Sequence, residues 1–241
     1  MGIDINKTTT FNFRGQTYQC VDVGPENPAF GTDEVDVKNR HWHIKPGEVI
    51  LDIGAAHGSY ALTALAQGAA KVYGWAPEGH YEFLKRNIEL NNWQDRGIAI
   101  STGLWSKTGW LRTDPRGPGF RETEPEPEKG TFTNYYGLPV EEPQVGPWFR
   151  VEALDETIVA QEPKLDFWKL DVEAAELEVL RGGEKLLRKH RPRLLIENHI
   201  QYVPSIYEDV KRFLLGLNIG YKEICTVPSG SYSHSFYQVD P

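Results

Sequence analysis

Acidic and histidine side chains follow two apolar segments of this chain, at positions where strands of a sheet are expected to end. Asp171 follows the segment 165–170, and Glu197 and His199 follow the segment 193–196. The carboxyl ends of parallel strands meet at one edge of a sheet, where ligands of open α/β sheets bind. Carboxylates and imidazoles are common general bases. Asp171, Glu197 and His199 are therefore the candidate catalytic residues, and a capping or core histidine is the alternative for His199.

The segment 49–58 carries a second chemical signal, because an apolar strand pattern leads through small residues into a helix pattern. Gly54 and Gly58 lack a Cβ, so the backbone can approach a ligand closely, and the helix start offers free N–H groups. Asp52 would repel a pyrophosphate and attract an ammonium or sulfonium group. Ala56 replaces a glycine that a dinucleotide loop needs. The candidate cofactor-binding residues are Asp52, Gly54, Ala55, Ala56, His57, Gly58 and Asp171. A structural turn with a helix-capping acid is the alternative.

The acidic candidates also raise the question of a metal ion. Asp171 and Glu197 together could bind Mg²⁺, which prefers oxygen ligands. The chain has no segment with the spacing of a dedicated metal-binding loop, and Cys20 and Cys225 lie far apart in the sequence. No metal site is therefore predicted, and a divalent ion is kept as an alternative.

These residues need alternating strands and helices to bring them to one edge. The predicted strands are 49–53, 71–75, 98–101, 165–170 and 193–196, and the predicted helices are 59–66, 81–90, 173–189 and 206–217. The alternation predicts an α/β fold with a mostly parallel sheet. Segments 221–227 and 235–239 close the chain as an antiparallel hairpin, because their linker is too short for a crossover.

Two segments depart from this alternation. Residues 1–48 are predicted to form an N-terminal extension, with a strand or hairpin in 11–23 and a short helix from residue 32 or 33 through Ile44, before a main domain of residues 49–241. Residues 112–148 are rich in proline and glycine and show no periodicity. Long loops of this kind are often functional, and their aromatic residues indicate a lid or substrate loop. A solvated insertion is the alternative.

Composition limits the partners and the compartment. The chain has 241 residues, a formal net charge of −8 and only two cysteines. Acidic balance argues against a nucleic-acid partner, which normally meets a basic face. Few cysteines and no secretory signal favour the reducing cytoplasm, and no apolar run approaches the roughly 20 residues that span a membrane. A small molecule or carbohydrate is the expected partner, and the sequence leaves the oligomeric state open.

Four stretches in this order resemble the FkbM family of class I S-adenosylmethionine-dependent methyltransferases. They are 51–58, 87–91, 151–155 and 169–176, with 192–197 behind the last. The resemblance implies a Rossmann-like fold, with a seven-stranded sheet in the order 3-2-1-4-5-7-6 and helices on both faces. It also implies S-adenosylmethionine lying over Asp52–Gly58, with its ammonium toward Asp52. The implied reaction is methylation of a hydroxyl on a sugar or small natural product.

The sequence departs from the family pattern at one position. The resemblance implies an acid that binds the ribose at the end of the second central strand, where this chain has Ala76. A hydrogen bond to a charged group contributes roughly 1.5–3 kcal/mol, so cofactor binding is weakened unless Glu78 supplies the carboxylate. A non-catalytic or weakened relative and a nicotinamide-dependent Rossmann oxidoreductase are therefore kept as alternatives. A nucleic-acid methyltransferase is disfavoured by the charge.

Overall fold

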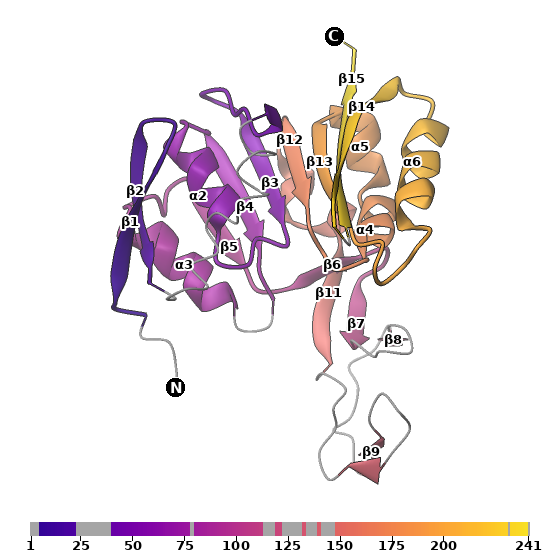
Figure 1. Cartoon of the computed structure of the whole chain (residues 1–241), viewed down its shortest axis with the longest axis horizontal. Helices are drawn as coiled ribbons and strands as arrows, with labels where there is room; N and C mark the ends of the chain where they lie inside the picture. Colours follow the sequence, from indigo (N-terminus) through magenta and orange to yellow (C-terminus); the bar gives the residue numbers. More distant parts are fainter. Residues whose placement is uncertain are drawn as a thin grey trace.

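The computed structural model describes residues 5–22, 40–77, 80–112, 119–121, 132–133, 139–140, 148–230 and 232–240. Its centre is a seven-stranded mixed sheet (Figure 1). In spatial order the strands are β14 (Tyr221–Ser229), β15 (Tyr232–Val239), β13 (Arg193–Asn198), β12 (Phe167–Leu170), β3 (Val49–Ile53), β4 (Lys71–Trp75) and β5 (Gly97–Ile100). β15 is antiparallel to β13 and β14, and the other neighbours are parallel. This arrangement has the predicted strand order and the predicted C-terminal hairpin.

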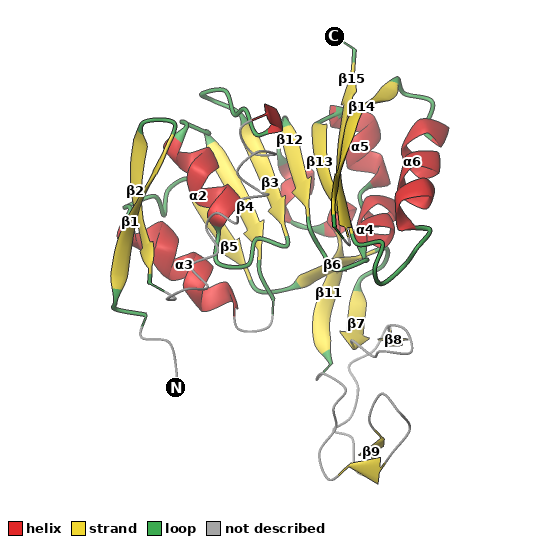
Figure 2. Cartoon of the chain, in the orientation of Figure 1, coloured by secondary structure: helices red, strands yellow, loops and turns green. Residues whose placement is uncertain are grey.

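Helices cover both faces of the sheet (Figure 2). They are α2 (Ser59–Ala66) and α3 (His80–Leu90) on one face, and α4 (Glu176–Gly182), α5 (Glu184–His190) and α6 (Ile206–Gly216) on the other. Among the described residues, none of the helices combines the length and apolar character that a membrane crossing requires.

Successive residues of the central strands supply two apolar cores, because side chains alternate between the faces of a sheet. In β3, Ile50 packs in the core that contains α2 and α3, whereas Leu51 and Ile53 pack in the core that contains α4, α5 and α6. Asp52 is in phase with Ile50, and Lys169 of β12 is in phase with Phe167 of the α2 core. The register pairs Asp52 with Lys169 across neighbouring strands. The fold therefore places these two charges side by side, beneath α2.

The predicted helix 173–189 is wrong as a single element. Helix α4 begins only at Glu176, because Glu173 and Ala174 have left-handed backbone angles, with φ of 52° and 76°. The helices α4 and α5 are separate at Gly183. A Cβ on Gly182 would lie 2.1 Å from the carbonyl oxygen of Trp105. The close contact of this helical position with the backbone of Trp105 therefore requires glycine at residue 182.

A second, four-stranded sheet is formed mainly by residues that flank the segment 112–148, in which the sequence predicts only irregular structure. Its strands, in spatial order, are β6 (Gly103–Trp105), β11 (Phe149–Ala153), β7 (Gly109–Arg112) and β8 (Gly119–Arg121), and a separate pair is β9 (Phe132–Thr133) and β10 (Pro139–Val140). Within 112–148 the prediction is wrong at β8, β9 and β10, and the rest of 113–147 lies outside the described residues. The guanidinium of Arg112 stacks 5.0 Å from the ring of Trp148, which joins the two ends of the insertion.

The N-terminal hairpin packs against α2 and α3 (Figure 1). It consists of β1 (Thr8–Phe13) and β2 (Gln16–Val21), paired antiparallel as predicted. The predicted helix through Ile44 is wrong at its end, because residues 42–45 are not helical. There Trp42 is fully buried and its indole donates a hydrogen bond to Thr63. Residues 23–39 of this prediction lie outside the described residues.

Asn87 of α3 joins the hairpin to the segment after β3. Its Oδ1 accepts from the backbone N–H of Val21 at 2.7 Å, and its Nδ2 donates to the carbonyl of His57 at 2.7 Å. We predict that Asn87→Ala lowers the free energy of unfolding by about 1–3 kcal/mol, because it leaves a buried N–H and a carbonyl without these partners. Urea denaturation measures this loss. Lys85→Ala, at an exposed position of the same helix, is the control, and an equal loss in both variants contradicts the prediction.

Candidate active site

The loop that follows β3 is bound to the ends of both neighbouring strands. Gly54 has φ of 80°, and a Cβ at this position would lie 1.7 Å from the carbonyl oxygen of Asp171. The N–H of Asp171 donates to Ile53 at 3.0 Å, and the N–H of Ala55 donates to Trp75 at 2.7 Å. The predicted cofactor loop is therefore in direct contact with the backbone of Asp171, a predicted catalytic residue.

Asp52 lies below this loop and is not exposed beside it. Its side chain is fully buried, and Oδ2 accepts a hydrogen bond of 2.8 Å from the N–H of Ala61 in α2. The sequence led us to expect that Asp52 faces the ammonium group of a ligand. In the structure its carboxylate points toward α2 instead, because alternate side chains of β3 lie on the face that α2 covers. Asp52 therefore fixes α2, and with it the loop, to the sheet.

The other predicted cofactor residues have varied environments. Ala56 is exposed, with φ of 46°, and Gly58 is buried with φ of 96°. His57 is partly buried, and its ring contacts His80 and Phe83 at centroid distances of 4.9 and 4.8 Å. Ala76 is buried at the end of β4. Glu78 lies outside the described residues, so its contact with a ribose stays a prediction.

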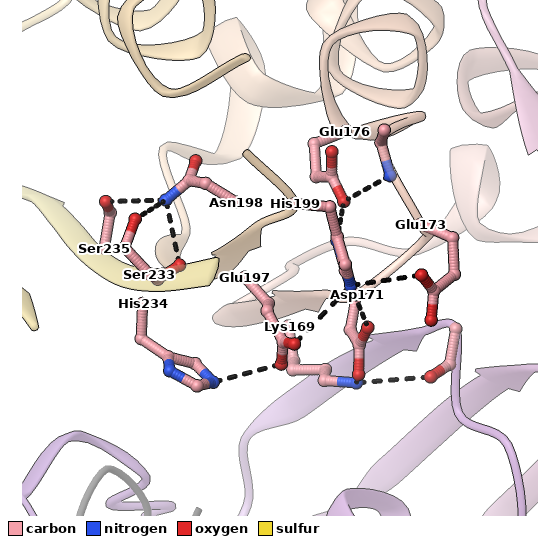
Figure 3. A network of polar contacts seen from close by, with 12 residues as sticks. Lys169, Asp171, Glu173, Glu176, Glu197, Asn198, His199, Ser233, His234 and Ser235 are labelled. Carbon is pink, nitrogen blue, oxygen red and sulfur yellow. Dashed lines mark hydrogen bonds and ion pairs between the residues drawn. The ribbon is translucent and has the colours of Figure 1, made fainter. Parts of the chain in front are cut away.

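The three predicted catalytic residues meet at the carboxyl ends of β12 and β13 (Figure 3). Nε2 of His199 lies 3.5 Å from Oδ1 of Asp171 and 3.5 Å from Oε1 of Glu197. Glu173, which is mostly exposed, brings Oε2 to the same distance from the same nitrogen. β13 extends through Asn198, so Glu197 belongs to the strand instead of following it. Three carboxylates thus converge on one imidazole nitrogen.

Glu176 orients the imidazole from the opposite side. Its carboxylate is fully buried at the start of α4, and Oε1 lies 2.7 Å from Nδ1 of His199. Burial alone lowers the pKa of His199, but the hydrogen bond to Glu176 and the charges of Asp171 and Glu173 outweigh burial and raise the pKa to about 9. The sequence indicates only a helix-dipole acid at Glu176, because nothing local shows its burial against His199.

Lys169 is a site residue that the sequence analysis did not select. It is buried, and Nζ lies 2.9 Å from Oδ2 of Asp171, 3.2 Å from the carbonyl of Gly54 and 3.9 Å from Oδ1 of Asp52. Burial raises the pKa of Asp171, but Lys169 and His199 outweigh burial and lower it below its usual value. A charged residue inside the apolar strand Phe167–Leu170 was the available signal, because a buried charge needs a partner.

β15 supplies the remaining polar contacts of the cluster. His234 pairs with Glu197 in the strand register, and its Nε2 lies 3.1 Å from Oε2 of that residue. Asn198 is fully buried and donates to Oγ of Ser235 at 2.9 Å (Figure 3). The sequence alone does not give these contacts, because they depend on the register between β13 and β15.

Comparisons with known proteins identify the family and the fold. A family model described as the methyltransferase FkbM domain matches residues 52–223. The structure of methyltransferase FkbM from Methylobacillus flagellatus KT is similar with a TM-score of 0.57 and 17% identity, over 81% of this chain and 44% of that chain. The chain thus spans less than half of that protein, and at this identity the likeness shows the fold alone.

Two further structures are similar at lower scores. The tRNA m1G37 methyltransferase of M. jannaschii has a TM-score of 0.49 and 11% identity, over 98% of this chain and 57% of that chain. TYW2 of P. horikoshii in complex with MeSAdo has a TM-score of 0.46 and 15% identity, over 96% and 70%. A search of curated proteins gave no match.

We predict that Gly54→Ala destabilises the protein more than Gly15→Ala. Both glycines have φ near 80°, so both variants carry the strain of roughly 1–2 kcal/mol for a left-handed residue. Only the Cβ at Gly54 also meets Asp171, whereas the Cβ at Gly15 meets nothing within 4 Å. Urea denaturation of the two variants separates overlap from strain. Equal losses of unfolding free energy in the two variants would contradict the prediction, because they would show that the loop accommodates the Cβ at residue 54 without further cost.

We predict that Lys169→Met lowers the free energy of unfolding by about 3–5 kcal/mol, because Asp52 and Asp171 keep buried charges without this cation. The measurement is chemical denaturation. Lys222→Met is the control, since Lys222 forms an ion pair with Asp240 in which both side chains are mostly exposed, and such a pair contributes about 0–1 kcal/mol. A small loss for Lys169→Met would contradict the role of the buried ammonium group.

Proposed function

The chain belongs to the FkbM methyltransferase family, and we propose that it transfers a methyl group from S-adenosylmethionine to a hydroxyl of a sugar or small natural product. The observation that carries the proposal is the contact between the Gly54 loop and Asp171. This contact places the predicted cofactor loop beside a partly exposed carboxylate. A methyl donor and a proton acceptor therefore fit at neighbouring positions on one sheet edge.

S-adenosylmethionine would lie over residues 54–58, where the left-handed angles of Gly54 and Gly58 open the backbone. Asp52 would act from below, by holding Ala61 of α2 and thereby the loop. The cofactor carries a positive sulfonium, and the carboxylates at this edge favour a cation. Ala76 offers no carboxylate to the ribose, so we assign that contact to Glu78.

Methyl transfer is an in-line displacement, and the protein contributes mainly orientation, which can supply about 7–11 kcal/mol. The acceptor hydroxyl must also lose its proton as the oxygen–carbon bond forms. Asp171 has 24% of its side chain exposed, whereas His199 has 3%. An acceptor molecule on the surface can therefore reach the carboxylate of Asp171 more readily than the imidazole of His199. We therefore assign proton acceptance to Asp171, and we assign its positioning to His199 and Glu197.

Two alternatives make different demands on this site. A nicotinamide-dependent oxidoreductase uses the same kind of sheet, but the family match favours methyl transfer over hydride transfer. A binding protein without turnover is favoured by Ala76, which removes one expected ribose contact. The first alternative requires binding of NADH, and the second requires that methyl transfer is absent with every acceptor.

We predict that calorimetry shows tighter binding of S-adenosylmethionine than of NADH, and that the protein releases S-adenosylhomocysteine when it is incubated with S-adenosylmethionine and a hydroxylated acceptor. Asp171→Asn should lower kcat by roughly 10²-fold or more, because it removes the proton acceptor. Asp95→Asn is the control, since Asp95 is exposed in the connection before β5, at the opposite edge of the sheet. Absent binding at millimolar cofactor contradicts the proposal, and unchanged turnover in Asp171→Asn contradicts the assigned base.

A further inference from the structure

The atoms that converge on Nε2 of His199 have the arrangement of a metal-binding group. We infer that Asp171, Glu173 and His199 bind a divalent transition-metal ion, with Glu197 as a further ligand. One ligand atom from each of the first three residues lies within 4.8 Å of the others. This inference concerns the ion alone, and it does not depend on the proposed methyl transfer.

The distances fit an ion held between these side chains. Oxygens of Asp171, Glu173 and Glu197 each lie 3.5 Å from Nε2 of His199, and all three point toward it (Figure 3). Ligands bound to zinc at about 2.0–2.2 Å in a tetrahedron are separated by about 3.3–3.6 Å. Each of the three oxygens already has this separation from the nitrogen.

The charge of the group also favours a cation. Among the described residues of this cluster, four carboxylates (Asp171, Glu173, Glu176 and Glu197) share three basic side chains (Lys169, His199 and His234). The carboxylates outnumber the basic groups even when both imidazoles are protonated. Lys169 also forms an ion pair with Asp52, a fifth carboxylate. The members of this cluster that are buried, such as Glu176, make negative charge costly there unless it is paired or coordinates a metal.

Two of the ligands are held by hydrogen bonds to residues that are not ligands themselves, which sets the position of their ligand atoms. Nδ1 of the buried His199 is held by Glu176 at 2.7 Å, which turns Nε2 toward the carboxylates. Oδ2 of Asp171 is held by Lys169 at 2.9 Å, and Oε2 of Glu197 lies 3.1 Å from Nε2 of His234. A carboxylate that holds the second nitrogen of a histidine is typical of metal sites, where it orients the ring.

The backbone that positions Glu173 is strained. Glu173 and Ala174 have left-handed angles, which non-glycine residues rarely adopt, and such strain occurs mostly at functional positions. The N–H of Ala174 is bonded to Glu176 at 3.1 Å, which ties this turn to the buried carboxylate. The turn returns the exposed Glu173 to His199, and its exposure gives an ion access to solvent or substrate.

The ligand set selects the class of ion. Imidazole suits zinc, iron and related ions, whereas carboxylates alone suit magnesium and calcium. One imidazole with two or three carboxylates therefore favours Mn²⁺ or Zn²⁺ over Ca²⁺.

Metal binding to the chelator-treated full chain, without cofactor or acceptor, tests the inference. Mn²⁺ binding is measured from the loss of the free-ion electron paramagnetic resonance signal, and Zn²⁺ should displace the bound Mn²⁺. Wild-type protein should bind one ion and gain thermal stability, since a ligand that binds only the folded state stabilises it. Glu173→Gln should weaken binding roughly tenfold or more.

Glu178→Gln is the matched control, because Glu178 is paired with Arg181 on α4 and lies outside the cluster. Its affinity for Mn²⁺ should equal that of the wild type. Absent binding of Mn²⁺ and Zn²⁺ at millimolar concentration overturns the inference, and so does equal affinity in Glu173→Gln. Tighter binding of Ca²⁺ than of Mn²⁺ contradicts the assigned class of ion. Because no turnover is measured, none of these outcomes depends on methyl transfer.

Discussion

The buried ammonium group of Lys169 is the interaction on which the rest of the site depends. It contacts Asp52 at the end of β3, the carbonyl of Gly54 in the following loop, and Asp171 at the end of β12. Burying an ion costs several kcal/mol unless its partners compensate. The ammonium is therefore favourable only while both strand ends supply oxygens to it. The cofactor loop and the carboxylate assigned to catalysis are held together by one cation, so neither can move without exposing or orphaning a charge.

Local patterns explain why much of the fold was predictable. Apolar runs such as Val49–Ile53 and Lys71–Trp75 end at small or turn residues, and these signals do not require knowledge of distant contacts. The long helix predicted over 173–189 failed for the opposite reason. Glu173 and Ala174 have left-handed angles before the helix begins, and α4 and α5 are separate at Gly183. Glu173 and Ala174 are not glycines, although glycine is the residue type that normally indicates such angles in a sequence.

The site divides in the same way. Asp171, Glu197 and His199 were predictable because each stands at the end of an apolar segment, and parallel strands bring such ends together. Glu176 and His234 were not, since their roles depend on how α4 and β15 are placed against His199 and Glu197. Sequence therefore predicted the residues that lie at the edge of the sheet, and it missed the residues that hold them there.

Burial separates these two groups physically. Glu176 and His199 are almost fully enclosed, Asp171 has 24% of its side chain exposed, and Glu173 has 69% exposed. The enclosed groups are fixed by short contacts in a medium of low dielectric, where such contacts are strongest. The side chains of Asp171 and Glu173 keep part of their surface in contact with solvent. A ligand, whether a hydroxyl or a metal ion, would thus meet oxygens whose positions are set before it arrives, and this reduces the cost of ordering them on binding.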